Sequence, residues 1–347
     1  MPRHRNAAYM PGSSPQQPVR MIDVARLAGV SAQTVSRTIS RPALVSAATR
    51  AMVRKAIDRL SYIPNSAARN LATSASRIVA AVIPTLSNSV YAEEVSHMTR
   101  LLEAEGYSVL IGDSEYSLER EGQLIQSFLE RRPEAMILTG TEHSRLTRRL
   151  IKQSGVLTIE TWNTDAPPIE LAVGFSNIGA GLAMGNHLVS RGYRAIAFVG
   201  GAEDQDYRGY ARYLGLAKAV KEAGLPTPPA IAVSMPPRKG DGIAGLERLL
   251  STYPKTDAVF FSSDALALNA MLECLRRGIP VPKRLAICGF GDYEYSDQVQ
   301  PRLTTIQIPA ALMGETAAHM ILESIHGKKL PERKVDIGFQ LVAREST

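Results

Sequence analysis

The chain has 347 residues, a formal net charge of +7 and two cysteines. This length is enough for two or three domains with sizeable cores, and no apolar run approaches the length of a membrane-spanning helix. Cys274 and Cys288 lie in apolar surroundings without metal-ligand spacing, as expected of buried thiols in a reducing compartment.

The positive charge is concentrated in one part of the chain. Residues 1–76 contain 11 Lys and Arg against 2 Asp and Glu, whereas residues 77–347 contain 29 against 31. Such clustering is the electrostatic footprint of a phosphate-binding segment. A membrane-surface helix would also need bulky apolar anchors, and none is evident. We therefore expect no membrane partner.

Residues 1–19 are rich in Pro, Gly, Ser and Gln and contain no apolar core of a secretion signal. We expect a disordered tail here. Without an export signal, the expected location is the cytoplasm, in association with the nucleoid.

Residues 20–64 carry the pattern of a helix-turn-helix DNA-binding domain. A first short helix ends at Gly29, and Ser31 is a good N-cap for a second helix through Ile39. In this motif the second helix lies in the major groove, where Gln can bind adenine and Arg can bind guanine through two hydrogen bonds. The residues expected to bury one side of the first helix are Ile22, Ala25, Leu27 and Ala28. The residues expected to contact DNA are Ser31, Ala32, Gln33, Thr34, Ser36 and Arg37.

Two ordered strings of residues identify a family. V-A-x-x-A-G-V-S-x-x-T-V-S-R begins at Val24, and Y-I-P-N-x-x-A-R-x-L begins at Tyr62. Together they resemble the LacI/GalR family of bacterial transcription regulators over residues 24–71. Between the two strings lies a third predicted helix, capped by Ser46 and carrying basic residues.

The resemblance implies that residues 65–76 are a hinge helix and linker. In the family this helix orders on operator DNA, pairs with its dimer mate and inserts a leucine into the minor groove. Such a wedge costs on the order of a few kcal/mol of base unstacking. A helix this short is not stable alone in water, which suits a switch. The DNA contacts implied here are Asn65, Ala68, Arg69 and Leu71.

Residues 77–347 alternate apolar runs with amphipathic segments, which predicts an α/β fold with parallel sheets and helical crossovers. The predicted strands are too many for one compact sheet, so we expect two doubly wound lobes. The predicted strands are 78–83, 107–112, 135–138, 156–160, 171–174, 195–199, 230–233, 258–261, 285–288 and 304–308, with 335–342 strand-like. The predicted helices include 90–105, 119–131, 178–190, 210–223 and 266–277.

The resemblance adds that this two-lobed part is similar to the periplasmic sugar-binding proteins of type I. It implies that the lobes divide near residue 174 and that the chain returns between them near 302–305 and 335–338. These two lobes would bind an effector and form a dimer.

In open parallel sheets, ligands bind beyond the carboxyl ends of the strands. Asp264 follows a predicted strand there, and its carboxylate can accept hydrogen bonds from ligand hydroxyls. Arg212 has R-x-x-G spacing to Gly215, as a cleft arginine of the family has, and a guanidinium can bind a carboxylate bidentately. A solvated helix charge is the alternative for Arg212, and plain packing for the aromatic candidates. The other effector-binding candidates are Asn88, Tyr91, Glu160, Trp162 and Asp292.

One position departs from the family pattern. Where the family commonly has Asp, this chain has Gly291, followed by Asp292. The usual pocket therefore does not transfer directly to this loop.

The search for catalysis finds no motif. The six histidines are scattered, and no nucleophile elbow, phosphate loop or Cys/His metal cluster is present in the sequence. We therefore expect no enzyme, no metal and no cofactor.

The leading interpretation is a DNA-binding regulator, with repression as the expected action, that binds a pseudopalindromic operator as a homodimer. Three stretches, 83–88, 172–177 and 336–339, resemble the gluconate-type repressors, which implies a sugar-acid effector such as gluconate or a ketogluconate. A neutral sugar is the alternative effector, and a non-regulatory sugar-binding protein is the alternative class. No heptad helix follows residue 342, which favours a dimer over a tetramer.

Overall fold

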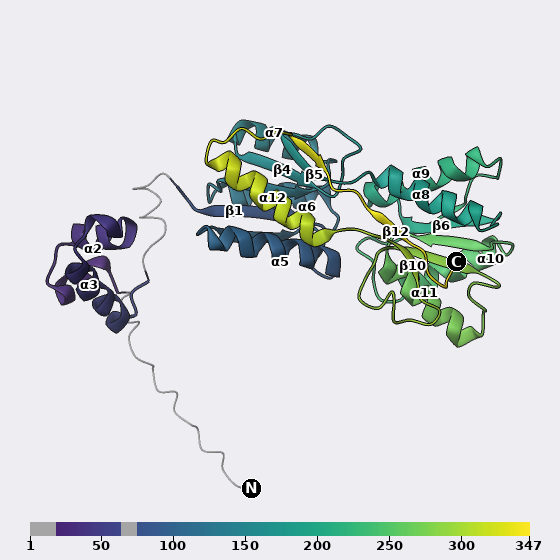
Figure 1. Ribbon diagram of the computed structural model, residues 1–347, viewed down its shortest axis with the longest axis horizontal. Coiled ribbons are helices and arrows are strands. Elements are labelled where there is room, and N and C mark those ends of the chain that lie inside the picture. Colours follow the sequence, from purple (N-terminus) through teal and green to yellow (C-terminus); the bar gives the residue numbers. More distant parts are fainter. Residues whose placement is uncertain (1–18, 64–74) are drawn as a thin grey trace, which may run out of the picture. The chain divides into compact units, whose positions relative to one another are not determined.

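The computed structural model describes residues 19–63 and 75–347, and the chain divides at Arg77 into two compact units (Figure 1). The predicted hinge residues Asn65, Ala68, Arg69 and Leu71 lie outside the described residues, as does nearly all of the predicted tail. In the described part of the chain, no helix is both long and apolar enough to cross a membrane.

The first unit is the predicted helix-turn-helix. Gly29 adopts φ 65° and ends the first helix, so that its N–H reaches the carbonyls of Ala25 and Arg26. The Ser31 hydroxyl accepts from Thr34 N at 3.1 Å and caps the second helix. The elements are α1 (Met21–Ala28), α2 (Ala32–Ser40), the 3-10 turn η1 (Pro42–Leu44) and α3 (Ala47–Leu60).

The buried side of α1 differs from the prediction. Ile22 is 52 % exposed and Leu27 is 43 % exposed, whereas Val24 and Ala25 are buried. The inward face has the spacing i, i+3, i+4, i+7, which starts at Met21 rather than at Ile22. The small core of the unit is completed by Val35, Val53, Ala56 and Tyr62.

The first lobe of the second unit is a six-stranded parallel sheet with the strand order β11-β5-β4-β3-β1-β2. Four of its strands, 78–83, 135–139, 157–161 and 171–174, are almost fully buried, as expected when helices cover a parallel sheet, whereas the edge strand 108–113 is partly exposed. The strands are β1 (Ile78–Ile83), β2 (Ser108–Asp113), β3 (Ala135–Thr139), β4 (Leu157–Thr161), β5 (Leu171–Gly174) and β11 (Lys334–Asp336). The helices are α5 (Ser89–Ala104), α6 (Leu118–Leu129), α7 (Arg145–Ser154) and α12 (Ala310–Ile325).

The second lobe has the order β12-β10-β9-β8-β6-β7 and is parallel except for β12, which runs antiparallel to β10. The strands are β6 (Ile196–Gly201), β7 (Ala230–Val233), β8 (Ala258–Phe261), β9 (Ala286–Gly291), β10 (Thr304–Gln307) and β12 (Gln340–Val342). The helices are α8 (Asn177–Ser190), α9 (Tyr207–Glu222), α10 (Asp241–Thr252) and α11 (Asp264–Arg277).

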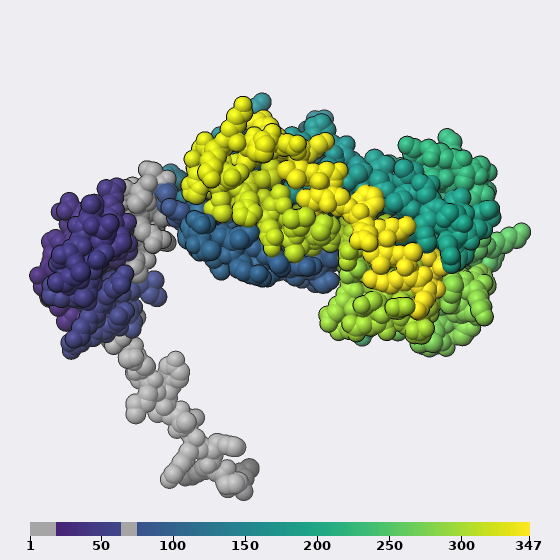
Figure 2. Space-filling view, viewed as in Figure 1, coloured from purple at the N-terminus to yellow at the C-terminus, as the bar shows by residue number. Residues whose placement is uncertain are grey.

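Three segments connect the lobes. The first lies between β5 and β6, and the third lies between β11 and β12, so the strand-like stretch 335–342 is shared by two sheets. Figure 2 shows this final segment, in yellow, lying along both lobes. The second connection, expected near 302–305, lies a few residues further along the chain. Thr304 begins β10, which pairs with β9 in the second lobe, and the chain leaves only after Gln307 for α12, which packs on α5.

Candidate effector pocket and DNA-binding surface

The second helix of the first unit presents a polar face. Val35 and Thr38 are buried, whereas Gln33 and Arg37 are exposed, and Ala32, Thr34 and Ser36 are partly exposed. Neither the Gln33 amide nor the Arg37 guanidinium forms a hydrogen bond within the described residues. Long polar side chains without partners on a capped helix are free to read base edges.

Basic residues also lie on α3. Arg54, Lys55 and Arg59 are exposed, and Arg50 donates to the carbonyl of Pro42 at 3.2 Å. Contacts between basic side chains and phosphates generally position a protein on DNA without reading its sequence.

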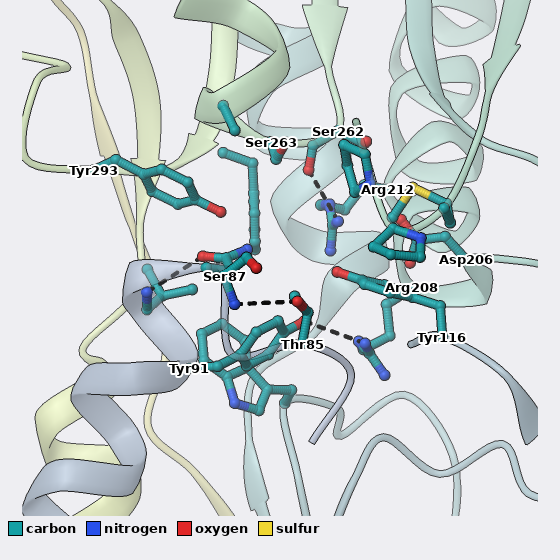
Figure 3. A pocket seen from close by; sticks show the side chains of 18 residues that line it. Thr85, Ser87, Tyr91, Tyr116, Asp206, Arg208, Arg212, Ser262, Ser263 and Tyr293 are labelled. Carbon is teal, nitrogen blue, oxygen red and sulfur yellow. Dashed lines mark hydrogen bonds between the residues drawn. The ribbon is translucent and has the colours of Figure 1, made fainter. Parts of the chain in front are cut away.

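A cavity of about 160 Å³ lies between the two lobes of the second unit. It is smaller than the roughly 300–1,000 Å³ of pockets for drug-sized ligands, so it suits a small molecule. Figure 3 shows Arg208 and Arg212 entering it between residues of the first lobe and residues of the second. The labelled first-lobe residues are Thr85, Ser87, Tyr91 and Tyr116, and the labelled second-lobe residues also include Asp206, Ser262, Ser263 and Tyr293.

Arg212 is placed by close packing of α8 against α9. A Cβ atom on Gly181 would lie 1.9 Å from the Arg212 carbonyl oxygen, and one on Gly215 would lie 2.0 Å from the Ile178 carbonyl oxygen. The two helices therefore touch backbone to backbone only because these residues are glycines. This contact brings Arg212 beside Asn177 at the start of α8.

The Arg212 guanidinium is 6 % exposed and only partly satisfied. Its Nη1 donates to Asn177 Oδ1 at 2.6 Å, its Nη2 donates to the Ser262 carbonyl at 3.1 Å, and it lies 3.9 Å from the centre of the Phe290 ring. Its Nε is buried without a hydrogen-bond partner. Burial lowers the pKa of Arg212 from its ordinary value, because desolvation disfavours the charged form.

Arg208 bridges the lobes. From α9 its Nη1 donates to the Thr139 carbonyl at 3.1 Å and to Tyr207 Oη at 3.1 Å, and its Nη2 donates to Tyr91 Oη at 3.2 Å. Asp206, which also lines the cavity, uses Oδ1 to cap α9 at Gly209 N, at 3.0 Å. All hydrogen bonds from the two guanidiniums to described residues thus go to neutral groups.

Aromatic side chains form the opposite wall. The rings of Tyr91 and Trp162 are edge to face, with centres 4.7 Å apart, and Trp162 contacts Phe175 in the same manner at 6.0 Å. Trp162 has φ 67°, a strained value for a bulky residue, and its indole Nε1 donates to Glu94. Burial raises the pKa of Glu94 from 4.5 to about 7.

Four of the predicted effector residues line the cavity, namely Asn88, Tyr91, Trp162 and Arg212. Asn88 also caps α5, because its Oδ1 accepts from Val90 N at 3.3 Å. The other three predicted residues, Asp264, Glu160 and Asp292, do not line it.

Asp264 points into the second lobe instead. It is fully buried, and its oxygens accept from Ser296 Oγ at 2.6 Å, Thr305 Oγ1 at 2.7 Å and Tyr293 N at 3.0 Å. Burial raises the pKa of Asp264 to about 6 despite these hydrogen bonds. As the first residue of α11, it faces the sheet, whereas its neighbours Ser262, Ser263 and Ala265 line the cavity.

The other two carboxylates are held by cations. Glu160 is buried and contacts His143 Nε2 at 3.0 Å, and the other nitrogen of that ring lies 2.9 Å from Glu121. These hydrogen bonds raise the pKa of His143 to about 9, although burial opposes them. Asp292 forms an ion pair with Arg344 at 2.7 Å.

Arg208 and Asp206 are cavity residues that sequence reasoning missed. The predicted helix begins at residue 210, whereas α9 begins at Tyr207 and is capped by Asp206. Arg208 is then one turn before Arg212 on the same helix face. The four-residue spacing of these arginines is the signal that could have revealed the pair.

In the described ranges 19–63 and 75–347, no group of three or more His, Cys, Asp or Glu residues could hold a metal ion. The polar groups of the cavity are two guanidiniums, hydroxyl and amide groups, and the carboxylate of Asp206.

Comparison with known proteins gives consistent matches. Residues 20–65 match the bacterial regulatory proteins of the lacI family, and residues 186–347 match a periplasmic binding protein-like domain. The HTH-type transcriptional regulator GntR of Pseudomonas aeruginosa is 38 % identical over 327 residues, 94 % of each chain. The regulator of the same name from Escherichia coli K12 is 33 % identical and covers 92 % of this chain and 96 % of that protein.

Among solved structures, a LacI-family transcriptional regulator from Silicibacter pomeroyi has a TM-score of 0.89 and 28 % identity. The match covers 95 % of this chain and 99 % of that one. The helix-turn-helix and the two lobes therefore occur together in a solved structure of a similar protein.

Proposed function

The chain belongs to the LacI family as a DNA-binding transcriptional regulator, and on this premise we propose that it is a cytoplasmic repressor whose operator affinity is set by a sugar acid. The DNA would be read by Gln33 and Arg37 on α2, with the exposed basic residues of α3 on phosphates. The hinge contacts Asn65, Ala68, Arg69 and Leu71 are part of the same proposal.

One observation carries the effector assignment. Arg208 and Arg212 are both buried in the cavity wall, and their hydrogen bonds go only to neutral groups, while Arg212 Nε has no partner among the described residues. Buried charges in proteins are normally paired, because an unpaired one is costly. The Asp206 carboxylate acts on both arginines through space but forms no hydrogen bond with either guanidinium. A ligand carboxylate would supply the charge-assisted hydrogen bonds that the two arginines lack.

The remaining lining fits a polyhydroxylated chain. Asp206, Ser262 and Asn88 offer hydrogen-bonding groups, and the Tyr91 and Trp162 rings offer apolar contact. Such contacts also fit a neutral sugar, so the cationic pair is the feature that favours an acid such as gluconate or a ketogluconate.

A second copy of the chain completes the proposal. On α11, Leu272 is 57 % exposed and Leu275 is 70 % exposed, and Tyr295 nearby is 61 % exposed. A homodimer that covered this apolar face would place two recognition helices on the half-sites of a pseudopalindrome. Sedimentation velocity is expected to show a dimer, and a Leu275→Glu variant is expected to shift it toward monomer.

A thermal-shift series tests the effector. The panel is D-gluconate, 2-ketogluconate, 5-ketogluconate and 6-phosphogluconate against glucose, galactose and ribose. A ligand at about a hundred times its Kd stabilises the folded state by roughly 2.7 kcal/mol. A higher Tm with one or more acids and with no neutral sugar is expected. A shift with neutral sugars alone would contradict the acid assignment.

Selection from a random library of double-stranded DNA by the full-length protein tests the proposed sequence-specific DNA binding. A pseudopalindromic consensus is expected, bound with an affinity that falls steeply with salt. Enrichment of no consensus would contradict the proposal independently of the thermal-shift result.

A further inference from the structure

Hydrogen bonds connect Arg212 to helix α5 through Trp162, which lines the cavity, and through Asn177 and Glu94, which do not. Arg212 donates to Asn177 Oδ1 at 2.6 Å, and Asn177 Nδ2 donates to the Trp162 carbonyl at 2.8 Å. The Trp162 indole then donates to Glu94 on α5. Asn177 is fully buried, and Glu94 and Trp162 are each 2 % exposed, so water does not interrupt the series.

This series passes through a connection between the lobes. Asn177 is the first residue of α8, directly after the segment that leaves β5 of the first lobe. Trp162 belongs to the first lobe, and its left-handed backbone depends on the surrounding contacts, including the Asn177 hydrogen bond. A change at Asn177 therefore acts on a loop whose backbone is strained at Trp162.

Helix α5 extends from the cavity to the start of the second unit. Tyr91 and Glu94 lie near its N-terminal end, and its 16 residues span about 24 Å at 1.5 Å each. Beyond its last turn, the Glu105 carbonyl accepts from Arg77 Nη1 at 3.3 Å. Arg77 is the first residue of the second unit, and its N–H donates to Glu134 at 2.7 Å.

We propose that Asn177 and Glu94 are positioning residues that transmit ligand occupancy at Arg212 through Trp162 to α5 and so to Arg77, where the chain continues toward the DNA-binding unit. The proposal rests on the proposed function, because it requires an anion at Arg212. A bound carboxylate competes with Asn177 Oδ1 for the guanidinium. Without its bond to the guanidinium, the Asn177 amide reorients, which changes its hydrogen bond to the Trp162 carbonyl. The resulting shift of Trp162 changes the hydrogen bond from its indole to Glu94.

The test separates ligand binding from its effect on DNA. Full-length Glu94→Met is compared with Glu94→Gln, which retains an acceptor for the indole, and with Glu93→Met, a matched change at the exposed neighbouring residue. The ligand is the panel acid that gives the largest thermal shift, and the DNA is the selected consensus. Two quantities are measured: the acid Kd, and the ratio of DNA Kd with and without saturating acid.

Trp162 is the only tryptophan of the chain, so intrinsic fluorescence reports the acid Kd at this site. We expect all three variants to bind the acid within about threefold of the unmodified protein. Allosteric ratios are typically about 5- to 150-fold. Glu94→Met should reduce the ratio to below about twofold, whereas Glu94→Gln and Glu93→Met should retain it.

A second variant guards against a folding defect in the first. Trp162→Phe keeps a ring but removes the indole donor, and its DNA Kd should become independent of the acid, as in Glu94→Met. Because this variant has no tryptophan, calorimetric titration measures its acid Kd and sets the saturating acid concentration. In the double variant Glu94→Met/Trp162→Phe, the ratio of DNA Kd with and without acid should fall no further than in either single variant, because both substitutions break the same series of hydrogen bonds. A full ratio in Glu94→Met would overturn the inference. If the unmodified protein binds no acid or no DNA, the proposed function has failed instead.

Discussion

The recognition face of α2 and the cavity between the lobes are built in opposite ways. The α2 face comes from consecutive residues on one capped helix, and its key side chains are exposed and unpartnered among the described residues. The cavity is assembled from loops and helices far apart in the chain, and its two arginines are buried and hydrogen-bonded to neighbouring residues. Substitutions on the exposed α2 face are therefore expected to leave stability unchanged, whereas substitutions in the buried cavity should change both ligand binding and stability.

The largest effect is expected at Arg212. Truncating one partner of a buried charge pair costs about 2–5 kcal/mol of binding free energy. Arg212→Met should therefore raise the Kd of the acid by roughly 30-fold or more. Lys218→Met is the control, because Lys218 is an exposed cation on the same helix. Calorimetric titration measures both. An unchanged acid Kd in Arg212→Met would remove the carboxylate from this site.

The buried carboxyl of Glu94 predicts a stability that depends on pH. Its pKa is about 7 in the folded protein, against 4.5 for an unperturbed glutamate, so the folded state binds more protons than the unfolded chain between these values. The free energy of unfolding should then fall as pH rises from about 4.5 to 7, by on the order of 3 kcal/mol.

Glu94→Gln isolates this contribution, because the amide cannot ionise. Urea unfolding at pH 5 and pH 8 should show a smaller loss in Glu94→Gln than in the unmodified protein, and Glu93→Gln should show the full loss. Asp264 shifts in the same direction, with its pKa raised to about 6, so part of the decline remains. Equal declines in both proteins would contradict the assignment to Glu94.

Gly140 tests the fit between the lobes. It has φ 92°, and a Cβ there would lie 1.6 Å from Tyr207 Oη of the other lobe. Gly140→Ala should weaken acid binding and also lower stability by about 1–3 kcal/mol. Gly155→Ala is the control, since it has φ 64° with no atom within 4 Å of the added Cβ. If both variants bind the acid equally well, the contact between the lobes is not required.

Substitution of Arg37 is expected to have the smallest effect on stability but a measurable effect on DNA-binding affinity. Losing one bidentate base contact costs about 1–3 kcal/mol. Arg37→Ala should lose this affinity mainly on the matched consensus and leave Tm unchanged, whereas Arg54→Ala should weaken binding to all sequences alike. Fluorescence anisotropy on consensus and single-base variants measures the difference. A uniform loss in Arg37→Ala would assign it to phosphate.

Local signals were enough to predict the helix-turn-helix and the succession of strands along the chain. Each of the ten predicted strands from 78–83 to 304–308 overlaps a strand of the structure. Capping chemistry is carried by neighbouring residues, so Gly29 and Ser31 act as their types predict. The phase of α1 is the exception, because Ile22 and Val24 are both apolar and only packing against α3 selects between them.

The pocket could be predicted only in part, for a physical reason. Arg212 and Trp162 followed from position after a strand or from family spacing, but the direction of a side chain at a helix start depends on what surrounds it. Asp264 turns inward because Ser296 and Thr305, distant in sequence, supply its donors.

The amino-acid sequence alone determined the division into a basic reading unit and a two-lobed unit, because charge clustering, capping and hydrophobic periodicity are local properties. Only the tertiary structure decided which polar residues face the cavity, where the chain returns after Gln307, and that Arg208 joins Arg212. These outcomes depend on contacts between residues many positions apart in the chain. Local sequence patterns do not specify which of these contacts form or how strong they are.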